Sequence, residues 1–357
     1  MNVLLTGGAG FIGSHTYVVL VESGFVPVIV DDFSNSHPVV LERLRQITGS
    51  EVLFERGDVC DTAWLTSVMK RHAINAVVHF AAHKAVAESV QQPLKYYRNN
   101  LGCTLSVLEA MQALDCKHLL YSSSATVYGD PDCVPITEEM PLSHKNPYGH
   151  TKLIAEDMLS ALSAADPSLQ IATLRYFNPV GAHESGLIGE NPNGPPNNLM
   201  PTLTQVAIGK QSTLEVFGDD YDTRDGTGVR DYVHVMDLAR GHAVSLAFLA
   251  KAGRGFTINL GTGRGYSVLE LIHAFEQVSG QAINYCVKPR RVGDVAECYA
   301  DVSRATALLG WTAQHSLFDM CRDAWRWQQL NPDGYSQSVD TLAGLNESVA
   351  ADALIKR

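Results

Sequence analysis

The chain has 357 residues, enough for a large hydrophobic core and more than one layer or domain. Its 45% hydrophobic and 18% charged residues are typical of a soluble globular protein, and its formal net charge of -11 argues against a general nucleic-acid or anionic-membrane partner. Seven scattered cysteines, at positions 60, 103, 116, 133, 286, 298 and 321, form no Cys-x-x-Cys pair, which predicts free thiols in a reducing cytoplasm. The first residues predict neither a signal peptide nor a membrane span.

A strand, a glycine-rich turn, a helix, a second strand and an acid follow one another in residues 3–32. Gly8, Gly10 and Gly13 have dinucleotide-binding spacing, because glycines permit a tight turn and close approach of a pyrophosphate to the helix N-terminus. Asp31 lies where an acid binds the adenosine ribose diol. An acid at this place repels a 2′-phosphate, so the pattern predicts NAD and not NADP.

Strands and helices continue to alternate through the first half of the chain. Repeated strand–helix units predict an α/β fold with a Rossmann-type doubly wound parallel sheet, in which ligands bind at the carboxyl ends of the strands. Further strands are predicted at residues 52–54, 76–80, 118–122 and 171–177, and helices at 64–71, 93–114 and 148–162. Four clusters fall at the predicted strand ends: Asp58-Val59, Phe80-Ala81-Ala82, Ser122-Ser123-Ser124 and Phe177-Asn178.

The regular alternation of strands and helices ends after Asn178. Residues 181–198 are rich in Gly, Pro and Asn and predict a long loop, and loops this long are usually functional or disordered. Short helices are expected at 202–208, 238–249 and 268–278, and a strand at 214–217. We therefore predict a Rossmann domain at residues 1–180, a smaller mixed α/β lobe at 181–335 with some segments returning to the first domain, and a C-terminal tail at 336–357.

Tyr148 and Lys152 are four residues apart, so a helix places them on one face. A tyrosine has an ordinary pKa near 10, and its use as a base at neutral pH needs a shift of about 3 units. A lysine about 4 Å away supplies interaction of that order. An ordinary surface pair is the alternative for an isolated Tyr-x-x-x-Lys.

Several motifs together resemble the UDP-glucose 4-epimerase family of the extended short-chain dehydrogenase/reductase superfamily. The resemblance extends from residue 1 to about Tyr335, and the downstream segments are more specific to nucleotide-sugar epimerases than the glycine and Tyr/Lys motifs. The motifs are Thr6-Gly-Gly-Ala-Gly-Phe-Ile-Gly13, Ser122-Ser-Ser-Ala-Thr-Val-Tyr128-Gly129, Tyr148-x-x-x-Lys152, Arg175-Tyr-Phe-Asn-Pro-Val-Gly-Ala182, Pro196-Asn-Asn-Leu-Met-Pro201 and Gly226-Thr-Gly-Val-Arg-Asp-Tyr232.

The resemblance implies transient oxidation of the sugar at C4. Tyr148 is then the base for the 4-hydroxyl, Lys152 lowers the pKa of Tyr148 and binds the nicotinamide ribose, and Ser124 hydrogen-bonds the sugar 4-oxygen. The family keeps NAD tightly bound, and it is usually a homodimer that pairs two helices per subunit. Here the candidates are the helices near residues 101–114 and 152–162, whose apolar stripes otherwise indicate ordinary core faces.

The same resemblance implies two sets of binding residues. The cofactor set is Gly7, Gly10, Phe11, Ile12, Gly13, Asp31, Asp32, Asn35, Ser36, Asp58, Val59, Phe80, Ala81, Lys84, Asn99, Tyr148, Lys152 and Phe177. The UDP-sugar set is Ser124, Tyr148, Asn178, Asn197, Asn198, Leu199, Phe217, Arg230, Tyr232, Arg291, Asp294 and Cys298. Two arginines suit a diphosphate, and internal pairs such as Arg230–Asp231 or Arg291–Asp294 are the alternative.

Two positions depart from the family pattern. Asp32 stands where the family often has Asn after the ribose acid, which alters adenosine binding slightly. Cys298 stands where bacterial members commonly carry a tyrosine beside the sugar. The smaller side chain leads to the hypothesis of a widened pocket that also admits UDP-GlcNAc and UDP-GalNAc, and a neutral packing substitution is the alternative.

Particular residues argue against three other functions. A nucleotide-sugar 4,6-dehydratase usually has Asp-Glu directly after the Ser/Thr, whereas Ala125-Thr126 follow Ser124 here. A non-catalytic NAD-binding regulator is expected to have lost part of the catalytic set, which is intact. A zinc site at His79 and His83 is disfavoured because no third ligand lies nearby in the sequence.

Overall fold

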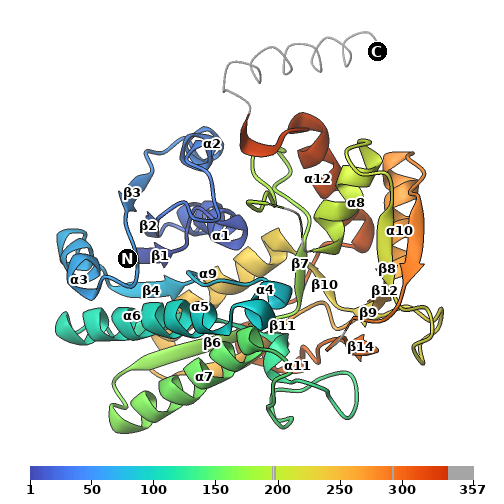
Figure 1. The fold of residues 1–357 in the computed structure, drawn as a ribbon. Helices are drawn as coiled ribbons and strands as arrows, with labels where there is room; N and C mark the ends of the chain where they lie inside the picture. Colours follow the sequence, from blue (N-terminus) through green and yellow to red (C-terminus); the bar gives the residue numbers. More distant parts are fainter. Residues whose placement is uncertain (195, 197, 292, 337–357) are drawn as a thin grey trace.

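A seven-stranded parallel sheet forms the centre of the computed structural model, which describes residues 1–194, 196, 198–291 and 293–336 (Figure 1). The strand order is β11-β6-β5-β4-β1-β2-β3. From β1 the chain adds β2 and β3 on one side, and it then crosses to the other side of β1 to add β4, β5, β6 and β11. This order confirms the predicted Rossmann-type doubly wound sheet. The strands are β1 Asn2–Thr6, β2 Val26–Asp31, β3 Leu53–Arg56, β4 Ala76–His79, β5 His118–Ser124, β6 Gln170–Tyr176 and β11 Phe256–Leu260.

Helices cover both faces of the sheet, which explains why its strands are nearly continuous apolar runs. Successive residues of β1 point to opposite sides: Leu5 packs in the cluster on the side of α1 and α9, and Leu4 packs in the cluster on the side of α3 and α6. One side holds α1 Phe11–Glu22, α2 Val39–Thr48, α9 Val235–Ala252 and α11 Ser303–Leu309, and the other holds α3 Thr62–Arg71, α6 Gly102–Ala113 and α7 Pro147–Ala165.

The helix predicted at residues 93–114 is present over nearly that whole range, but it is not a uniform α-helix. The structure has α5 Pro93–Tyr96, a π-helical turn at Tyr97–Leu101 and then α6. The wider turn is stabilised by Asn100, whose side chain donates to the carbonyl oxygen of His83 and to the hydroxyl of Thr151, each at 3.0 Å. A short helix, α4 Val86–Gln91, precedes this segment. π-helical turns often mark functional places, and this one carries Asn99.

A smaller lobe with its own apolar core lies beside the sheet (Figure 1). Its helices α10 and α12 both begin with a capping box, formed by Ser267 with Glu270 and by Ser316 with Asp319. The chain returns to the main sheet through α9 and β11 before it completes this lobe. The helices are α8 Leu199–Ala207, α10 Val268–Ser279 and α12 Leu317–Leu330, and the strands are β7 Asn178–Val180, β8 Leu214–Phe217, β9 Val229–Arg230, β10 Tyr232–His234, β12 Tyr266–Ser267, β13 Tyr285–Lys288 and β14 Glu297–Cys298.

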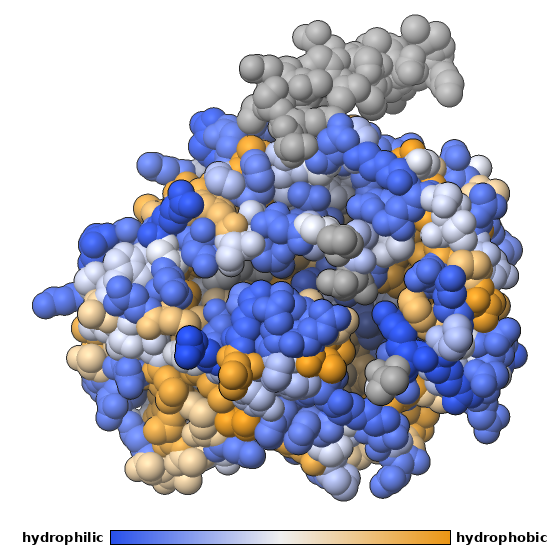
Figure 2. All heavy atoms as spheres, in the orientation of Figure 1, coloured by the Kyte–Doolittle hydropathy of each residue, from blue (hydrophilic) through white to orange (hydrophobic). Residues whose placement is uncertain are grey.

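Large apolar side chains are exposed on the helices of one side. Leu94 of α5, Leu105 of α6 and Leu162 of α7 are each more than one-third exposed. Figure 2 shows apolar residues gathered over the part of the molecule where α6 and α7 lie. Within the described residues, no helix combines the length and the apolarity needed to cross a bilayer. Of the predicted tail at residues 336–357, all but Ser336 lies outside the described residues.

Candidate active site

The turn between β1 and α1 is packed so closely that only glycine fits at its key positions. Gly7 has a left-handed backbone with φ of 68°, and a Cβ there would lie 2.9 Å from the amide nitrogen of Ala81. A Cβ at Gly13 would lie 2.5 Å from the carbonyl oxygen of Gly7. The turn thus presents the N-terminus of α1 as a close-fitting cradle, suited to a pyrophosphate. The predicted cofactor contacts in it are Gly7, Gly10, Phe11, Ile12 and Gly13.

Asp31, at the end of β2, is fixed against the glycine turn. Its Oδ2 accepts a hydrogen bond from the amide of Ala9 at 3.0 Å. Its Oδ1 accepts from the amide of Phe33 at 2.9 Å and from the hydroxyl of Ser36 at 2.7 Å. Burial raises the pKa of this carboxyl, and the three hydrogen bonds oppose the rise. The acid predicted to recognise a ribose diol is therefore held beside the predicted pyrophosphate cradle.

The other predicted cofactor residues lie at or beyond the carboxyl ends of neighbouring strands. Thr6 joins two of these ends, because its carbonyl oxygen accepts from the amide of Phe80 at 3.0 Å and its hydroxyl accepts from the amide of Ala81 at 3.3 Å. Contact of these residues with a cofactor stays a prediction. Asp32, Asn35 and Ser36 follow β2, Asp58 and Val59 follow β3, Lys84 follows β4, Asn99 lies in the π-helical turn and Phe177 follows β6.

The helix α7 brings Tyr148 and Lys152 beside the end of β5. The helix begins after Asn146, whose side chain caps its first turn. The Nζ of Lys152 donates to the carbonyl oxygen of Ser122 at 2.6 Å, and Ser124 ends the same strand. The three predicted catalytic residues thus come from adjoining elements.

Burial dominates the electrostatics of this trio. Lys152 is only 4% exposed, and burial lowers its pKa to about 8, while the carboxylate of Glu156 acts in the opposite direction. Burial also raises the pKa of Tyr148, whereas a hydrogen bond with Ser124 and the charge of Lys84 lower it. In this chain, therefore, dehydration outweighs the cations at Tyr148, and Lys84 is the lysine whose charge acts on the phenol. The expectation that Lys152, helped by a positive nicotinamide ring, lowers this pKa stays a prediction for the cofactor-bound site.

A buried ion pair that the sequence analysis did not identify holds α7 against the sheet. Arg175 of β6 contacts both carboxylate oxygens of Glu156, at 2.6 and 3.1 Å. The hydroxyl of Ser123 also donates to Glu156, and Arg175 donates to the hydroxyl of Tyr128 at 2.9 Å. Glu156 lies one helical turn beyond Lys152 on the same face, a spacing that could have indicated its role.

Arginines of the smaller lobe gather around Tyr221. The guanidinium of Arg290 lies 4.1 Å from the centre of this ring. The charges of Arg230, Arg290 and Arg291 all act to lower the pKa of Tyr221, against burial, which raises it. Arg290 was not predicted, although it is adjacent to Arg291, and its Nε contacts an Asp220 oxygen at 2.7 Å. Three arginines thus lie near one ring, and two of them are paired with the carboxylates of Asp220 and Asp294.

The two predicted diphosphate-binding arginines have different partners. Arg291 forms an ion pair with Asp294 at 3.2 Å, and its guanidinium lies 4.4 Å from the centre of the Phe217 ring. Arg230 donates to the carbonyl oxygen of Val229 at 2.8 Å, and the ion pairs among the described residues leave it without a carboxylate. The internal-pair alternative thus fits Arg291 but not Arg230.

Asp231 has a structural role in this lobe. The carboxylate is buried and accepts hydrogen bonds from Thr262, Gly263 and Ala300 at 2.6 to 3.1 Å. Burial raises the pKa of this carboxyl, and the hydrogen bonds oppose that rise. Arg230 takes no part in this network, and its guanidinium donates instead to the backbone carbonyl oxygens of Val229 and Ala296.

The remaining predicted substrate residues occupy varied environments. Tyr232 is buried in the apolar core of the lobe, and burial raises its pKa to about 12. Cys298 of β14 is paired with Arg230 of β9, and burial raises its pKa to about 11. Asn178 begins β7, and Asn198 and Leu199 begin α8. Asn197 lies outside the described residues.

Glu190, which is in neither predicted set, connects the two sets. Its Oε1 accepts from the Nζ of Lys84 at 2.9 Å and from the side-chain nitrogen of Asn198 at 2.6 Å. Lys84 belongs to the predicted cofactor set, and Asn198 to the predicted UDP set. The only signal in the sequence was the position of Glu190 within the long predicted loop.

His79 is engaged with hydroxyl groups at both ring nitrogens. Its Nδ1 lies 2.7 Å from the hydroxyl of Thr6, and its Nε2 lies 3.2 Å from that of Thr104. Burial lowers its pKa to about 3, and the charge of Lys152 adds to this effect. These partners fix His79 in the core between β1 and α6, which speaks against its use as a zinc ligand together with His83.

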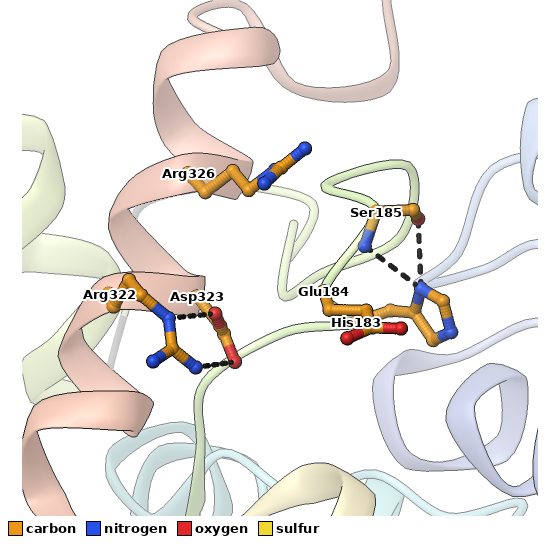
Figure 3. A pocket seen from close by; sticks show the side chains of 6 residues that line it. All are labelled: His183, Glu184, Ser185, Arg322, Asp323 and Arg326. Atoms are coloured by element: carbon orange, nitrogen blue, oxygen red, sulfur yellow. Dashed lines mark hydrogen bonds and ion pairs between the residues drawn. The ribbon is translucent and has the colours of Figure 1, made fainter.

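A separate cavity of about 430 Å³ lies between the loop after β7 and α12 (Figure 3). Charges of both signs line it, and Arg322 contacts the carboxylates of Asp323 and Asp319. None of its lining residues belongs to the predicted catalytic or binding sets. The lining residues are His183, Glu184, Ser185, Arg322, Asp323 and Arg326.

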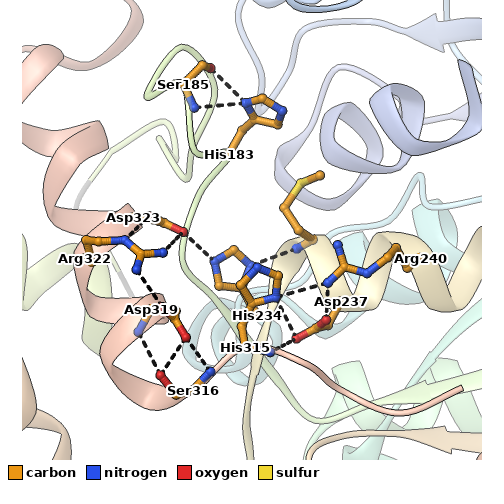
Figure 4. A network of polar contacts seen from close by, with 11 residues as sticks. His183, Ser185, His234, Asp237, Arg240, His315, Ser316, Asp319, Arg322 and Asp323 are labelled. Atoms are coloured by element: carbon orange, nitrogen blue, oxygen red, sulfur yellow. Dashed lines mark hydrogen bonds and ion pairs between the residues drawn. The ribbon is translucent and has the colours of Figure 1, made fainter. Parts of the chain in front are cut away.

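Beside this cavity, two stacked histidines join α9 to the smaller lobe (Figure 4). The rings of His234 and His315 lie 4.1 Å apart. His234 contacts Asp323 of α12 at 3.2 Å, and His315 contacts Asp237 of α9 at 3.0 Å. The junction between the lobe and the sheet thus depends on carboxylate–imidazole pairs.

Comparisons with known proteins agree with this arrangement. A family model described as "GDP-mannose 4,6 dehydratase" matches residues 4–324. A UDP-glucose 4-epimerase of Dictyostelium discoideum is 54% identical over 338 residues, covering 94% of this chain and 98% of that protein. The Homo sapiens UDP-glucose 4-epimerase is 52% identical over 341 residues, covering 94% and 98%.

Solved structures give the same result. The UDP-glucose 4-epimerase of Bifidobacterium longum, in complex with NAD⁺ and UDP, superposes with a TM-score of 0.91 at 52% identity and covers 94% of this chain and all of that one. A structure from Stenotrophomonas maltophila, with bound NAD and formylated UDP-arabinopyranose, has a TM-score of 0.91 at 52% identity, covering 92% and 98%.

The doubly wound sheet, the glycine turn and the Ser/Tyr/Lys site define a short-chain dehydrogenase/reductase type of enzyme that acts on nucleotide sugars. Within that class, identity above 50% over nearly the whole length decides the family. The chain belongs to the UDP-glucose 4-epimerase family.

Proposed function

We propose that this protein reversibly epimerises C4 of the sugar in UDP-glucose and UDP-galactose, with NAD as a resident cofactor. The observation that carries this proposal is the placement of Ser124, Tyr148 and Lys152 beside one strand end, in a chain about half identical to UDP-glucose 4-epimerases along nearly its whole length. The absence of a carboxylate in Ala125-Thr126 also favours epimerisation over elimination of water.

The residues of this chain fit the cofactor. The glycine cradle has no space for a Cβ at Gly7 or Gly13, and Asp31 presents a carboxylate beside it. A bound NAD would supply the acceptor, and then the donor, of the hydride at C4 of the sugar, and its positive nicotinamide would favour the phenolate of Tyr148. The cofactor ends each cycle unchanged, so the chain has reason to retain it.

The protein side chains handle the proton and the orientation. Tyr148 takes the proton of the 4-hydroxyl and later returns it. Ser124 hydrogen-bonds the 4-oxygen and, through its contact with Tyr148, favours the charged phenol. Lys152 binds the nicotinamide ribose from a buried position fixed by the carbonyl oxygen of Ser122. The arginine cluster of the smaller lobe binds the diphosphate.

An assay without added cofactor tests this proposal directly. Purified protein is incubated with UDP-galactose alone, and the product is identified. Formation of UDP-glucose is expected. A 4-keto-6-deoxy sugar would instead indicate a dehydratase, and an unchanged substrate together with bound NAD would indicate a regulator.

The second part of the proposal concerns N-acetylated sugars. Cys298 pairs in register with Arg230, so it lies next to the predicted diphosphate ligand, and its side chain is much smaller than a tyrosine. We infer that the space admits an N-acetyl group at C2, and that UDP-GlcNAc and UDP-GalNAc are also substrates. Cys298→Tyr is expected to lose turnover of UDP-GalNAc and to keep that of UDP-galactose. Equal turnover of UDP-GalNAc by both proteins would contradict the idea.

The third part concerns assembly and location. The exposed leucines of α5, α6 and α7 support a homodimer formed through these helices, and the seven free thiols support a cytoplasmic location. Light scattering of the wild-type chain is expected to give twice the monomer mass, and Leu105→Asp is expected to give a monomer. Phe318→Asp, an exposed apolar position on α12, is the matched control and should remain dimeric.

A further inference from the structure

Two thiols meet beside the predicted adenosine end of the cofactor cradle. The Sγ atoms of Cys60 and Cys103 are 2.8 Å apart. Cys60 directly follows Val59 in the turn after β3, and its Sγ lies 3.7 Å from the carbonyl oxygen of Asn99. Cys103 is buried in the first turn of α6, whereas Cys60 is half-buried and can meet small solutes. The proposed mechanism uses neither thiol.

We propose that Cys60 and Cys103 are a redox-reactive pair that forms a reversible intrachain disulfide between the turn after β3 and α6. A disulfide has its sulfurs about 2.05 Å apart, so bond formation requires the sulfurs to approach by less than about 1 Å. The two segments are already joined by neighbouring hydrogen bonds. The hydroxyl of Ser106 donates to the carbonyl oxygen of Cys60 at 3.1 Å, and that of Thr62 donates to Ser106 at 2.9 Å.

The environment gives the two thiols different roles. A hydrogen bond from Cys103 lowers the pKa of Cys60, while that bond and burial raise the pKa of Cys103. The carboxylates of Asp58 and Asp32 act against thiolate formation at both residues. Cys60 is therefore the attacking thiolate, and Cys103 is the resolving thiol.

The oxidant we propose is a hydroperoxide. The Cys60 thiolate attacks the terminal oxygen, the O–O bond breaks, and the leaving oxygen takes a proton to become an alcohol or water. The resulting sulfenic acid is attacked by the sulfur of Cys103, so that the S–S bond forms, the S–O bond breaks and water leaves. Two thiols are oxidised by two electrons and one hydroperoxide is reduced. A dithiol reverses the reaction by exchange.

A metal site is the competing interpretation of this cluster. Ligand atoms of Asp58, Cys60 and Cys103 all lie within 4.8 Å of one another. Two thiolates on a tetrahedral zinc, each about 2.3 Å from the metal, are about 3.8 Å apart, so these sulfurs would have to separate by about 1 Å. In addition, Oδ1 of Asp58 already accepts from the amide of Cys60 at 2.8 Å. The geometry therefore favours the disulfide.

The bond would affect the cofactor site, a consequence that rests on the proposed function. It would join the turn that carries Asp58 and Val59 to the helix that follows Asn99, and all three are predicted cofactor contacts. A shift of about 1 Å at these positions is enough to disturb hydrogen bonds to a ligand. We therefore expect the oxidised protein to release NAD faster than the reduced protein.

The test uses the full chain treated with a small excess of hydrogen peroxide. Thiol titration in denaturant is expected to fall from seven groups to five, the intact mass should fall by two hydrogen atoms, and non-reducing peptide mapping should give a Cys60–Cys103 linked peptide. Dithiothreitol should restore all three values. Cys60→Ser and Cys103→Ser should each abolish the linked peptide. Cys133→Ser removes an exposed thiol outside this pair and should leave the link intact.

Three results would overturn the proposal. These are retention of all seven thiols, a link to a different cysteine, or zinc that copurifies and shields Cys60 and Cys103 until a chelator removes it. Release of NAD is measured separately on the oxidised and reduced proteins, and equal rates would refute the effect on the cofactor. Epimerase activity of the reduced protein is an independent measurement, so failure of the disulfide and failure of the proposed function are distinguishable.

Discussion

The catalytic helix and the arginine cluster of the smaller lobe hold their charges in opposite ways. Lys152, Glu156 and Arg175 are almost completely buried, and the chain itself supplies their partners. The side chain of Arg291 is more than half exposed, and its partner Asp294 is itself partly exposed. Buried charges depend on fixed partners, whereas exposed pairs contribute little because water competes. The difference suggests that the sheet provides the chemistry with rigid geometry, while the lobe adjusts affinity.

Removal of the proposed base, Tyr148, should have the largest effect on activity and tests whether the chemistry depends on the catalytic helix. Tyr148→Phe keeps the ring and deletes only the hydroxyl, so we expect kcat to fall by at least about 10³-fold. Retained NAD and the affinity for UDP should stay unchanged, because the smaller lobe is untouched. Steady-state turnover, cofactor absorbance and UDP titration check these outcomes. Turnover at the wild-type rate would refute the assigned base.

The two arginines of the lobe should respond unequally. Arg230→Ala removes a guanidinium without a carboxylate partner among the described residues, so we expect the loss of charge-assisted hydrogen bonds worth about 1.5–3 kcal/mol, or about 10–100-fold in UDP affinity. Arg291→Ala should cost less than about 5-fold, because Arg291 is shared with Asp294. Calorimetric titration with UDP measures both. A larger effect at Arg291 would reverse the ranking.

Acid should destabilise the sheet and the helices packed on it through buried histidines that have no carboxylate partner in the described part of the chain. Burial lowers the pKa of His15 and His79 to about 3 and that of His242 to about 4. The unfolded chain binds these protons near pH 6.5, so unfolding becomes easier as the pH falls from 6.5 towards 3. At pH 5 each such imidazole should cost about 2 kcal/mol.

His79→Gln sharpens this prediction, because an amide can still hydrogen-bond the hydroxyls of Thr6 and Thr104 but does not titrate. The loss of unfolding free energy between pH 7 and pH 5 should be about 2 kcal/mol smaller in the variant. Urea denaturation at the two pH values measures this difference. Identical losses in both proteins would show that His79 is not a source of acid sensitivity.

The smallest expected effect concerns the link between the two regions. Glu190→Gln keeps an acceptor for Asn198 but removes the charge that pairs with Lys84. We expect UDP affinity and NAD retention to fall together by about 2–5-fold, a range typical of a partly exposed pair. Glu184→Gln, at an exposed position in the same loop, is the control. A change in only one of the two ligands would disprove the link.

The sequence predicted the sheet better than its connections. Buried parallel strands are continuous apolar runs, so six of the seven strands of the sheet were located close to their observed bounds. Asp31 and the glycine turn were recognisable because their roles depend on residues nearby in the chain. The catalytic spacing of Tyr148 and Lys152 was similarly local.

Features set by distant residues were missed or misjudged. The π-helical turn depends on Asn100, whose partners lie 17 and 51 residues away. Glu190 depends on Lys84, which is 106 residues away. The effect of Lys84, whose charge lowers the pKa of Tyr148 against burial, was not predicted, because Lys84 comes from another strand end. Such contacts leave no periodic or local pattern in a single sequence.

The edge strand β11 has a consequence for how the molecule can be divided. Its residues, Phe256–Leu260, come from the second half of the chain, yet they pair along β6 for five consecutive positions. A fragment that stopped at residue 180 would expose β6 as a long unpaired edge and would strip away α9, which covers one face. Open strands of this kind invite pairing between molecules. The sheet domain therefore needs α9 and β11, which come from the second half of the chain, in order to remain free of aggregation.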